Sequence, residues 1–222
     1  MTYKLICFDM DGVIFKDINF WMELHKKFGT LEQGIKLTEK YLHSNYEKLV
    51  EEVVVKLWKG KNAKPYFELV KSIEYLPGVP KVFQHVKKQD WVTSIISASS
   101  IDVARRVQQD YGIDHIFANE LVIKDGKVSG EFIWPIGVGK HKKAEIIRHL
   151  CKDLGIKTKE VIYIGDSDTD IEAFQEVGLS IAFNSQSEAL KEVATHVVDS
   201  NNLADVLPYL KDKVKGSNRT RA

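Results

Sequence analysis

The stretch FDMDGVIF, residues 8–15, places the carboxylates of Asp9 and Asp11 directly after an apolar run at residues 5–8. Side chains two positions apart point the same way on extended backbone, so these two negative charges face each other. At a separation of about 4 Å their repulsion is roughly 1 kcal/mol in water and about 4 kcal/mol at a protein-surface dielectric. A bound cation, a shared proton or full solvation must offset this repulsion where the buried strand ends.

Short apolar runs recur along the chain and predict buried parallel strands. Near-continuous runs of valine and isoleucine are typical of strands that are covered on both faces. Apolar residues at helical spacing separate these runs, and an Asp125-Gly126 turn predicts a hairpin over residues 121–128. This alternation predicts a doubly wound, Rossmann-like α/β sheet. The expected strands are residues 3–8, 91–97, 161–165, 179–183 and 196–198, and the expected helices include residues 79–86, 171–177 and 203–210.

The connection between the first two strands is longer than one crossover needs. Residues 15–77 carry apolar stripes at helical spacing and end at Pro77-Gly78. We therefore expect an inserted helical cap domain at residues 15–77. The α/β core domain would comprise residues 1–14 and 78–213, and residues 214–222 would form a flexible tail.

Composition restricts the function classes. The 222 residues carry 32 basic and 31 acidic side chains, and this balance makes nucleic acid or an anionic membrane an unexpected partner. Cys7 and Cys151 lie within apolar patterns and are expected to be buried thiols rather than a disulfide. No signal peptide or membrane-spanning run is evident, so a cytoplasmic location is expected. The oligomeric state and the organism are left open.

Polar groups follow three of the predicted strands. Asp9 and Asp11 follow the first, Ser97 ends the second, and a cluster of acids at residues 166–170 follows the third. Ligands of open α/β sheets bind outside the carboxyl ends of the strands, so these groups are expected to converge. Each group alone is typical of a turn or a helix cap. Together they favour a hard divalent cation with oxygen ligands, of which Mg²⁺ is the most plausible.

Four features of the sequence resemble, in order, the four motifs of the haloacid dehalogenase superfamily. They are FDMDGV, Ser97 after an apolar strand, a later helix lysine, and GDSDTD at residues 165–170. The stretches FANELVIKDGKVSGEF, residues 117–132, and GLSIAF, residues 178–183, resemble its phosphoserine phosphatase branch. The resemblance covers most of the chain. It implies a Mg²⁺-dependent phosphomonoester hydrolase that acts through an aspartyl-phosphate intermediate on a small phosphorylated metabolite.

The resemblance also implies roles for the acids. Asp9 would be the nucleophile. Asp11 would protonate the leaving alkoxide and then activate the hydrolytic water. Asp9, the main-chain carbonyl of Asp11 and Asp166 would hold Mg²⁺. Asp170 would support a metal-bound water or the site lysine.

Phosphate-binding groups are implied in the same way. Ser97 and the neighbouring Ala98 would contact the phosphoryl group together with a lysine from residues 140–143. Lys143 shares its helical face with the apolar residues that follow it, whereas the adjacent Lys142 must point elsewhere. Lys140 precedes the helix or barely enters it. We therefore predict Lys143 as the site lysine, with Lys140 and Lys142 as the alternatives.

Two departures from the branch bear on the substrate. Ser97-Ala98-Ser99 stands where the branch usually has Ser-Gly-Gly, so a close backbone approach is partly lost. Ile18 lies near the place of a cap glutamate that holds the serine amine, and no arginine precedes Arg105 to hold the carboxylate. Broad activity on small phosphomonoesters is therefore expected, with phosphoserine phosphatase proper as the alternative.

Other functions use similar groups. Carbon–halogen hydrolysis needs neither a second acid nor Mg²⁺, so Asp11 argues against it. A phosphoryl mutase shares the aspartyl-phosphate. A receiver-type signalling domain also combines acids with Mg²⁺, but it lacks a helical insertion after its first strand. A non-catalytic phosphate-binding module would not need the complete set of catalytic groups.

Overall fold

A mostly parallel sheet forms the middle of the computed structural model, which describes residues 2–16, 18–138 and 140–210. Within these ranges the sheet has seven strands in the order β4-β3-β2-β1-β5-β6-β7, and each neighbouring pair is parallel except β3 and β4. The predicted doubly wound sheet is therefore confirmed. The strands are β1 (Leu5–Phe8), β2 (Val92–Ser100), β3 (His115–Lys124), β4 (Lys127–Ile133), β5 (Val161–Gly165), β6 (Leu179–Phe183) and β7 (His196–Val198).

The centre of the sheet brings its two acidic loops together. Every residue of β1 and of β5 is buried, as expected for strands covered on both faces. Phe8 pairs with Ile164, so the carboxyl ends of these two strands are level. Asp9 follows Phe8 directly, and Asp166 follows the end of β5. Strand register alone therefore places these two acids side by side at one edge.

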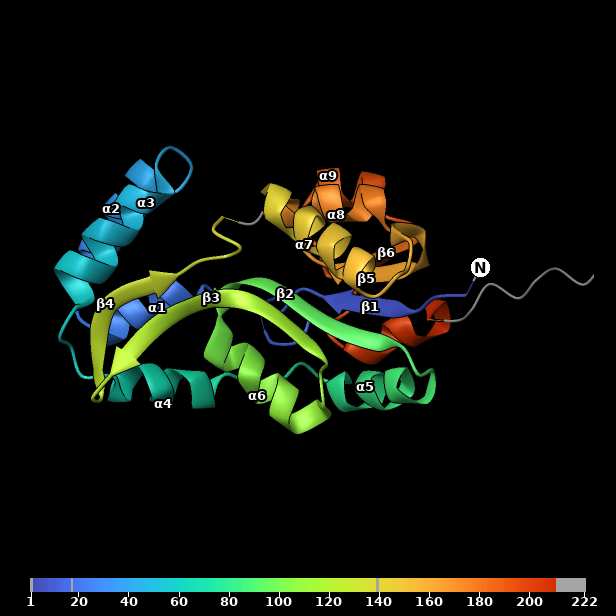
Figure 1. The fold of residues 1–222 in the computed structure, drawn as a ribbon, viewed down its shortest axis with the longest axis horizontal. Helices are drawn as coiled ribbons and strands as arrows, with labels where there is room; N and C mark the ends of the chain where they lie inside the picture. The colour runs from blue at the N-terminus through green and yellow to red at the C-terminus, as the bar shows by residue number, and fades with distance from the viewer. Residues whose placement is uncertain (1, 17, 139, 211–222) are drawn as a thin grey trace, which may run out of the picture.

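Helices cover both faces of the sheet (Figure 1). Helices α5 (Val79–Lys88) and α6 (Ile101–Tyr111) lie on one face, and α7 (Lys140–Asp153), α8 (Ile171–Glu176) and α9 (Glu188–Val193) lie on the other. The expected last helix consists of 3₁₀ turns, η4 (Leu203–Tyr209), and it contains Pro208, which lacks the N–H needed to extend an α-helix. Cys7 and Cys151 are free, buried thiols, as predicted.

The hairpin is longer than the sequence pattern indicated. Strand β3 begins at His115 and pairs with β2 before it turns back along β4, whereas only residues 121–128 were predicted. The buried amide of Asn119 interrupts the apolar pattern of β3 and hides its first half. The predicted two-residue turn is confirmed, because Asp125 and Gly126 both have positive φ.

The insert after β1 is helical, as predicted. Its elements are α1 (Phe20–Lys27), α2 (Leu31–Tyr41), α3 (Tyr46–Val50), the π-helical continuation η1 (Glu51–Trp58) and α4 (Lys64–Ser72). The β3–β4 hairpin extends to this insert (Figure 1), where Gly60 N donates to Val128 O at 2.8 Å and Ala63 N to Gly126 O at 2.8 Å. The tip of the hairpin is thus hydrogen-bonded to the insert. The boundaries predicted at residues 15 and 77 stay predictions, and the predicted tail lies outside the described residues.

The two chain segments that join insert and core pair with each other. The rings of Phe15 and Tyr75 stack with centroids 4.6 Å apart, and Leu76 N donates to Ile14 O at 2.9 Å. The Arg106 guanidinium lies 4.7 Å from the ring centroid of Phe15 and also hydrogen-bonds to main-chain carbonyls at the end of α4. The two places where the chain passes between core and insert therefore form a paired and stacked junction.

Candidate active site

Asp9 is held at the sheet edge by its own backbone and by its neighbours. Its amide donates to Ile164 O at 2.9 Å, which continues the pairing between β1 and β5. Its carboxylate is nearly buried, and Oδ1 accepts a hydrogen bond from Met10 N at 2.6 Å. Gly12 then turns the chain with φ +77°, and a Cβ at this position would lie 2.1 Å from Asp166 Oδ2. Only glycine combines this turn with the close approach of Asp166.

Lys143 joins Asp9 to a second acid. Its side chain is 1% exposed, and Nζ donates to Asp9 Oδ2 at 2.7 Å and to Asp170 Oδ1 at 2.7 Å. Lys142 lies on the exposed side of α7 and pairs with Glu145. The structure therefore brings Lys143 to Asp9 rather than Lys142, in agreement with the helical-face argument. The side chain of Lys140 lies outside what the structure describes.

Asp170 organises the loop after β5. It is fully buried, and its Oδ2 accepts hydrogen bonds from Asp166 N and Ser167 N at 3.1 Å each. Its Oδ1 accepts from Tyr163 Oη at 2.9 Å in addition to Lys143. A Cβ on Gly165 would lie 2.5 Å from the Asp170 carboxylate. These contacts shape the loop that carries Asp166.

The electrostatics of this edge favour a cation. Carboxylate oxygens of Asp9, Asp166 and Asp170 all lie within 4.8 Å of one another. Burial raises the pKa of Asp9 to about 6, and the Asp170 carboxylate adds to this increase while Lys143 opposes it. Burial by itself would lower the pKa of Lys143, but Asp170 and Asp9 outweigh it and hold that pKa above its usual value. Three carboxylates and one ammonium leave two negative charges, which suits a divalent ion with oxygen ligands.

Ser97 and Ala98 lie within the last part of β2, which continues to Ser100 rather than ending at residue 97. Ser97 is buried, and its Oγ accepts a hydrogen bond from Ser99 N at 3.2 Å. Ile95 pairs with Phe8, so Ser97 lies at the same sheet edge as Asp9. Asp11 is partly buried two residues after Asp9. All the predicted site residues thus belong to this edge or to α7.

Three residues at this edge were not predicted from the sequence. Trp21 Nε1 and Asn119 Nδ2 donate to Ala98 O at 3.0 and 2.9 Å, and Tyr163 donates to Asp170. Asn119 had a visible signal, because an amide in the middle of a strand needs a hydrogen-bonding partner. Trp21 and Tyr163 follow the apolar patterns of a helix and a strand, and those patterns do not show where an indole N–H or a phenol O–H points.

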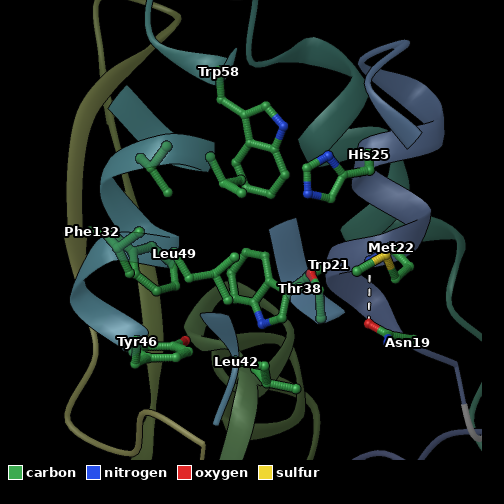
Figure 2. Close-up of a pocket in the computed structure, with 13 residues that line it drawn as sticks. Asn19, Trp21, Met22, His25, Thr38, Leu42, Tyr46, Leu49, Trp58 and Phe132 are labelled. Atoms are coloured by element: carbon green, nitrogen blue, oxygen red, sulfur yellow. Dashed lines mark hydrogen bonds between the residues drawn. The ribbon is translucent and has the colours of Figure 1, made fainter. Parts of the chain in front are cut away.

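One cleft is lined by site residues, and one pocket is linked to the site through Trp21. An apolar pocket of about 120 Å³ lies between the insert helices and Phe132 of β4, where rings and aliphatic side chains surround it (Figure 2). A polar cleft of about 780 Å³ is lined by Gly12 and Asp166 from the sheet edge and by Lys16 and His43 from the insert segment. The cleft is therefore next to the proposed metal ligand Asp166, and the pocket is next to the Trp21 side chain that contacts Ala98.

Comparisons with known proteins agree with this arrangement. A family model of haloacid dehalogenase-like hydrolases matches residues 3–178. The chain is 27% identical to a phosphoserine phosphatase of Methanocaldococcus jannaschii over 94% of this chain and 98% of that protein. It is 28% identical to a phosphoserine phosphatase of Archaeoglobus fulgidus, of which it spans 60%.

Solved structures show the same likeness. A phospho-aspartyl intermediate analogue of phosphoserine phosphatase superposes with a TM-score of 0.79 at 27% identity, over 95% of this chain and 100% of that chain. A substrate-bound phosphoserine phosphatase complex gives the same TM-score, identity and coverage. Among the described residues, no helix has the length and apolar character required to cross a bilayer.

Proposed function

Since this chain belongs to the haloacid dehalogenase-like hydrolases, we propose that it hydrolyses small phosphomonoesters with Mg²⁺ as its cofactor. The chain is a phosphatase of this family that works through a phospho-aspartyl intermediate. The observation that supports the residue assignments best is the buried contact of Lys143 with both Asp9 and Asp170. A lysine buried between two acids, at an edge where a third acid converges, orients the nucleophilic carboxylate, and a bound divalent cation would offset the remaining negative charge so that a phosphoryl group can approach.

In the first step, a carboxylate oxygen of Asp9 bonds to phosphorus while the bond from phosphorus to the alcohol oxygen breaks. Asp11 gives its proton to the departing alkoxide. In the second step, the Asp11 carboxylate takes a proton from water, whose oxygen then attacks phosphorus and releases Asp9. Lys143 orients the Asp9 carboxylate throughout, because it donates to Oδ2 while Met10 N donates to Oδ1.

Phosphate binding is assigned to groups around Asp9. The hydroxyl of Ser97 and the main chain at Ala98 lie at the same sheet edge as Asp9 and would hydrogen-bond phosphoryl oxygens. The Lys143 ammonium would compensate negative charge on the phosphoryl group during its transfer. Trp21 and Asn119 hold the Ala98 carbonyl, and so they fix the position of this segment.

Mg²⁺ fits the oxygen donors of this edge. Asp9, Asp166 and the main-chain carbonyl of Asp11 would hold it, and Asp170 would support the Asp166 loop and Lys143. When bound, the ion would supply positive charge to the phosphoryl oxygens. The close packing of Asp166 against Gly12 positions the Asp166 carboxylate for this task.

Phosphate release from p-nitrophenyl phosphate tests this proposal. We expect turnover with Mg²⁺, no turnover in excess chelator, and a loss of more than about a hundredfold in kcat for Asp9→Asn, which corresponds to about 2.7 kcal/mol. Circular dichroism and a thermal melt check that this variant folds. Full activity in chelator, or a smaller loss for the variant, would contradict the assignment.

The more specific candidate is phosphoserine phosphatase itself. The names of the similar proteins favour it, since relatives with 27% and 28% identity are named phosphoserine phosphatase. The insert argues for broader activity, because residues 1–104 contain no arginine and Ile18 packs against the apolar core. A panel of kcat/KM values for phosphoserine, phosphoglycolate and sugar phosphates decides between them. Broad activity predicts phosphoserine within about a hundredfold of the others, whereas a lead of about a thousandfold or more supports the specific enzyme.

The remaining predictions concern location and partners. We propose a small-molecule phosphomonoester as the partner, because the near-balance of charge offers no field for nucleic acid or an anionic membrane. The cytoplasmic location stays a prediction, and cell fractionation with an antibody to the protein tests it.

A further inference from the structure

The apolar pocket beside the insert differs in character from the polar cleft, and Trp21 links it to the sheet edge. Its wall draws on α1, α2, α3, η1 and β4 (Figure 2). Its aromatic and aliphatic side chains include Trp21, Leu42, Tyr46, Val50, Trp58 and Phe132. Such an aromatic and aliphatic wall is typical of a small-molecule site that binds by apolar contact.

The pocket adjoins the phosphate-binding strand through Trp21. The indole forms part of the wall, and its Nε1 donates to Ala98 O at 3.0 Å. Ala98 follows Ser97, which lies at the sheet edge beside Asp9. The same ring also packs edge-on against Phe132, with centroids 5.2 Å apart. A group that extends from a phosphoryl oxygen at Ser97 toward the insert would therefore meet this wall.

The wall offers no partner for a charged group. Among the residues that the structure describes, no lysine, arginine, aspartate or glutamate lines the pocket. Burial lowers the pKa of His25 to about 4, so the imidazole is neutral near pH 7. Burial raises the pKa of Tyr46 to about 12, so the phenol stays protonated. An ammonium or a carboxylate in this pocket would lose its hydration without gaining a counter-charge.

The remaining polar groups of the wall are largely committed to contacts within the insert. His25 Nδ1 shares a hydrogen bond with Thr30 Oγ1 at 2.8 Å, and Asn19 Oδ1 accepts from Met22 N at 3.2 Å to cap α1. Trp58 Nε1 donates to Thr30 Oγ1 at 3.2 Å. Thr38 and Tyr46 add two hydroxyl groups to the wall, and the rest of it consists mainly of rings and aliphatic chains.

We infer that this pocket receives the alcohol part of the substrate and selects phosphomonoesters whose alcohol carries an uncharged apolar or aromatic group. The inference rests on the proposed hydrolysis at Asp9. It names a substrate class that differs from an amino-acid phosphate, which would bring two charges into the pocket. Apolar walls discriminate by the area that they bury, so we expect a preference of about 10- to 100-fold.

Three phosphomonoesters test the inference. Ethyl phosphate and 2-phenylethyl phosphate release primary alcohols of similar acidity, so their comparison isolates the contact made by the phenyl group. We expect kcat/KM for 2-phenylethyl phosphate to exceed that for ethyl phosphate by about 10- to 100-fold. Phosphoserine should lie at least tenfold below 2-phenylethyl phosphate, about the smallest preference that an apolar pocket gives.

Matched variants on one stretch of helix locate the effect. Val50 is part of the wall, whereas Val55 is 41% exposed. Val50→Phe fills the pocket. The ratio of kcat/KM for 2-phenylethyl phosphate to kcat/KM for ethyl phosphate should then fall to about threefold or less, because little of the apolar preference remains. Val55→Phe should keep the wild-type ratio. If Val50→Phe fails to fold, Val50→Ala enlarges the pocket and should move the preference toward 3-phenylpropyl phosphate.

The outcomes separate this inference from the proposed function. If no ester releases phosphate, the proposed function is wrong. If all esters are hydrolysed and kcat/KM is equal for ethyl phosphate and 2-phenylethyl phosphate, the pocket does not hold the alcohol part. The inference is then overturned. A preference for phosphoserine that Lys16→Gln abolishes would overturn it too, because it would place the alcohol part in the polar cleft instead.

Discussion

The sheet edge and the insert pocket solve different recognition problems. At the edge, Asp9, Lys143 and Asp170 are buried charges, and each has a hydrogen-bonding partner of opposite charge within 2.7 Å. In the pocket, the ring centroids of Trp21 and Trp58 lie 6.4 Å apart. Among the described residues, no lysine, arginine, aspartate or glutamate lines its wall. The edge therefore suits the phosphoryl group that all candidate substrates share. The pocket suits the part of the substrate that differs.

The two regions are also held in different ways. Backbone amides position the edge, since Asp9 N, Asp166 N and Ser167 N all take part in its hydrogen bonds. Contact between side chains positions the pocket, as the rings of His25 and Trp58 show with centroids 4.6 Å apart. A substitution in the pocket wall changes its shape, whereas a substitution at the edge changes its charge balance. This difference predicts where selectivity can change while the chemistry is retained.

The largest expected effect is on proton transfer at the edge. Asp11→Asn keeps the main-chain carbonyl assigned to Mg²⁺ but cannot exchange a proton, so kcat should fall by about 10²- to 10⁴-fold. Isothermal titration with Mg²⁺ should give a dissociation constant close to that of the wild type. Asp168→Asn, an exposed acid in the loop after β5, serves as the control. If Mg²⁺ binding is lost and the rate at saturating metal persists, the roles assigned to Asp11 are wrong.

Charge balance at the edge gives the next largest effect. Lys143→Met leaves Asp9 and Asp170 buried without their cation, so the free energy of unfolding should fall by about 3–5 kcal/mol. Urea unfolding at pH 7 measures this loss. Lys142→Met, one position along α7, removes an exposed ion pair and should leave the unfolding curve unchanged. Equal losses for the two variants would show that the buried pair is not what stabilises this edge.

Lowering the pH should change the free energy of unfolding in opposite directions through the two regions. The pKa of His25 is about 4 in the folded protein and 6.5 ordinarily, so between these values the unfolded chain takes up the proton first. The contribution of His25 to the free energy of unfolding is therefore full above pH 6.5. It falls by about 1.4 kcal/mol per pH unit, and by about 3 kcal/mol in total, as the pH drops toward 4. His25→Phe should remove this loss.

Asp9 should act in the reverse direction in metal-free protein. Its pKa is about 6 when folded and 3.8 ordinarily, so between these values the folded protein holds more protons. Its contribution to the free energy of unfolding therefore rises as the pH falls through 6 toward 3.8. Urea midpoints from pH 7 to pH 4 for His25→Phe and Asp9→Asn, each compared with wild type, should change in opposite directions. Parallel curves would contradict the contrast between the regions.

The smallest effect concerns the link between the regions. Trp21→Phe keeps an aromatic ring in the pocket but removes the hydrogen bond to Ala98 O, which is worth about 1 kcal/mol. We expect kcat/KM to fall by about fivefold for ethyl and for 2-phenylethyl phosphate alike. Trp58→Phe removes a similar bond that stays inside the insert, and it should lower stability rather than the rate on ethyl phosphate. Identical kinetic effects of both variants would show that the bond to Ala98 has no particular role.

Local patterns were enough to predict the sheet and most of its active edge. Side chains alternate along a strand and recur at helical spacing, so Asp9 at the end of β1 and Lys143 on the inner face of α7 follow from periodicity. The acids after β5 follow from the rule that ligands bind at the carboxyl ends of parallel strands. These features depend on residues close together in the chain, whose geometry the sequence itself specifies.

Contacts between distant segments were settled only in the folded protein. Trp21 reaches Ala98 across 77 positions, a contact that no local pattern indicates, and Lys143 reaches Asp9 across 134 positions. The hairpin tip at Gly126 hydrogen-bonds to the insert because β3 extends beyond β2. Periodicity indicates which face of an element is buried, but the partner of that face depends on how all the elements pack. The convergence of acids at the sheet edge could therefore be predicted from the sequence, whereas the pocket, built from five separate elements, required the tertiary structure.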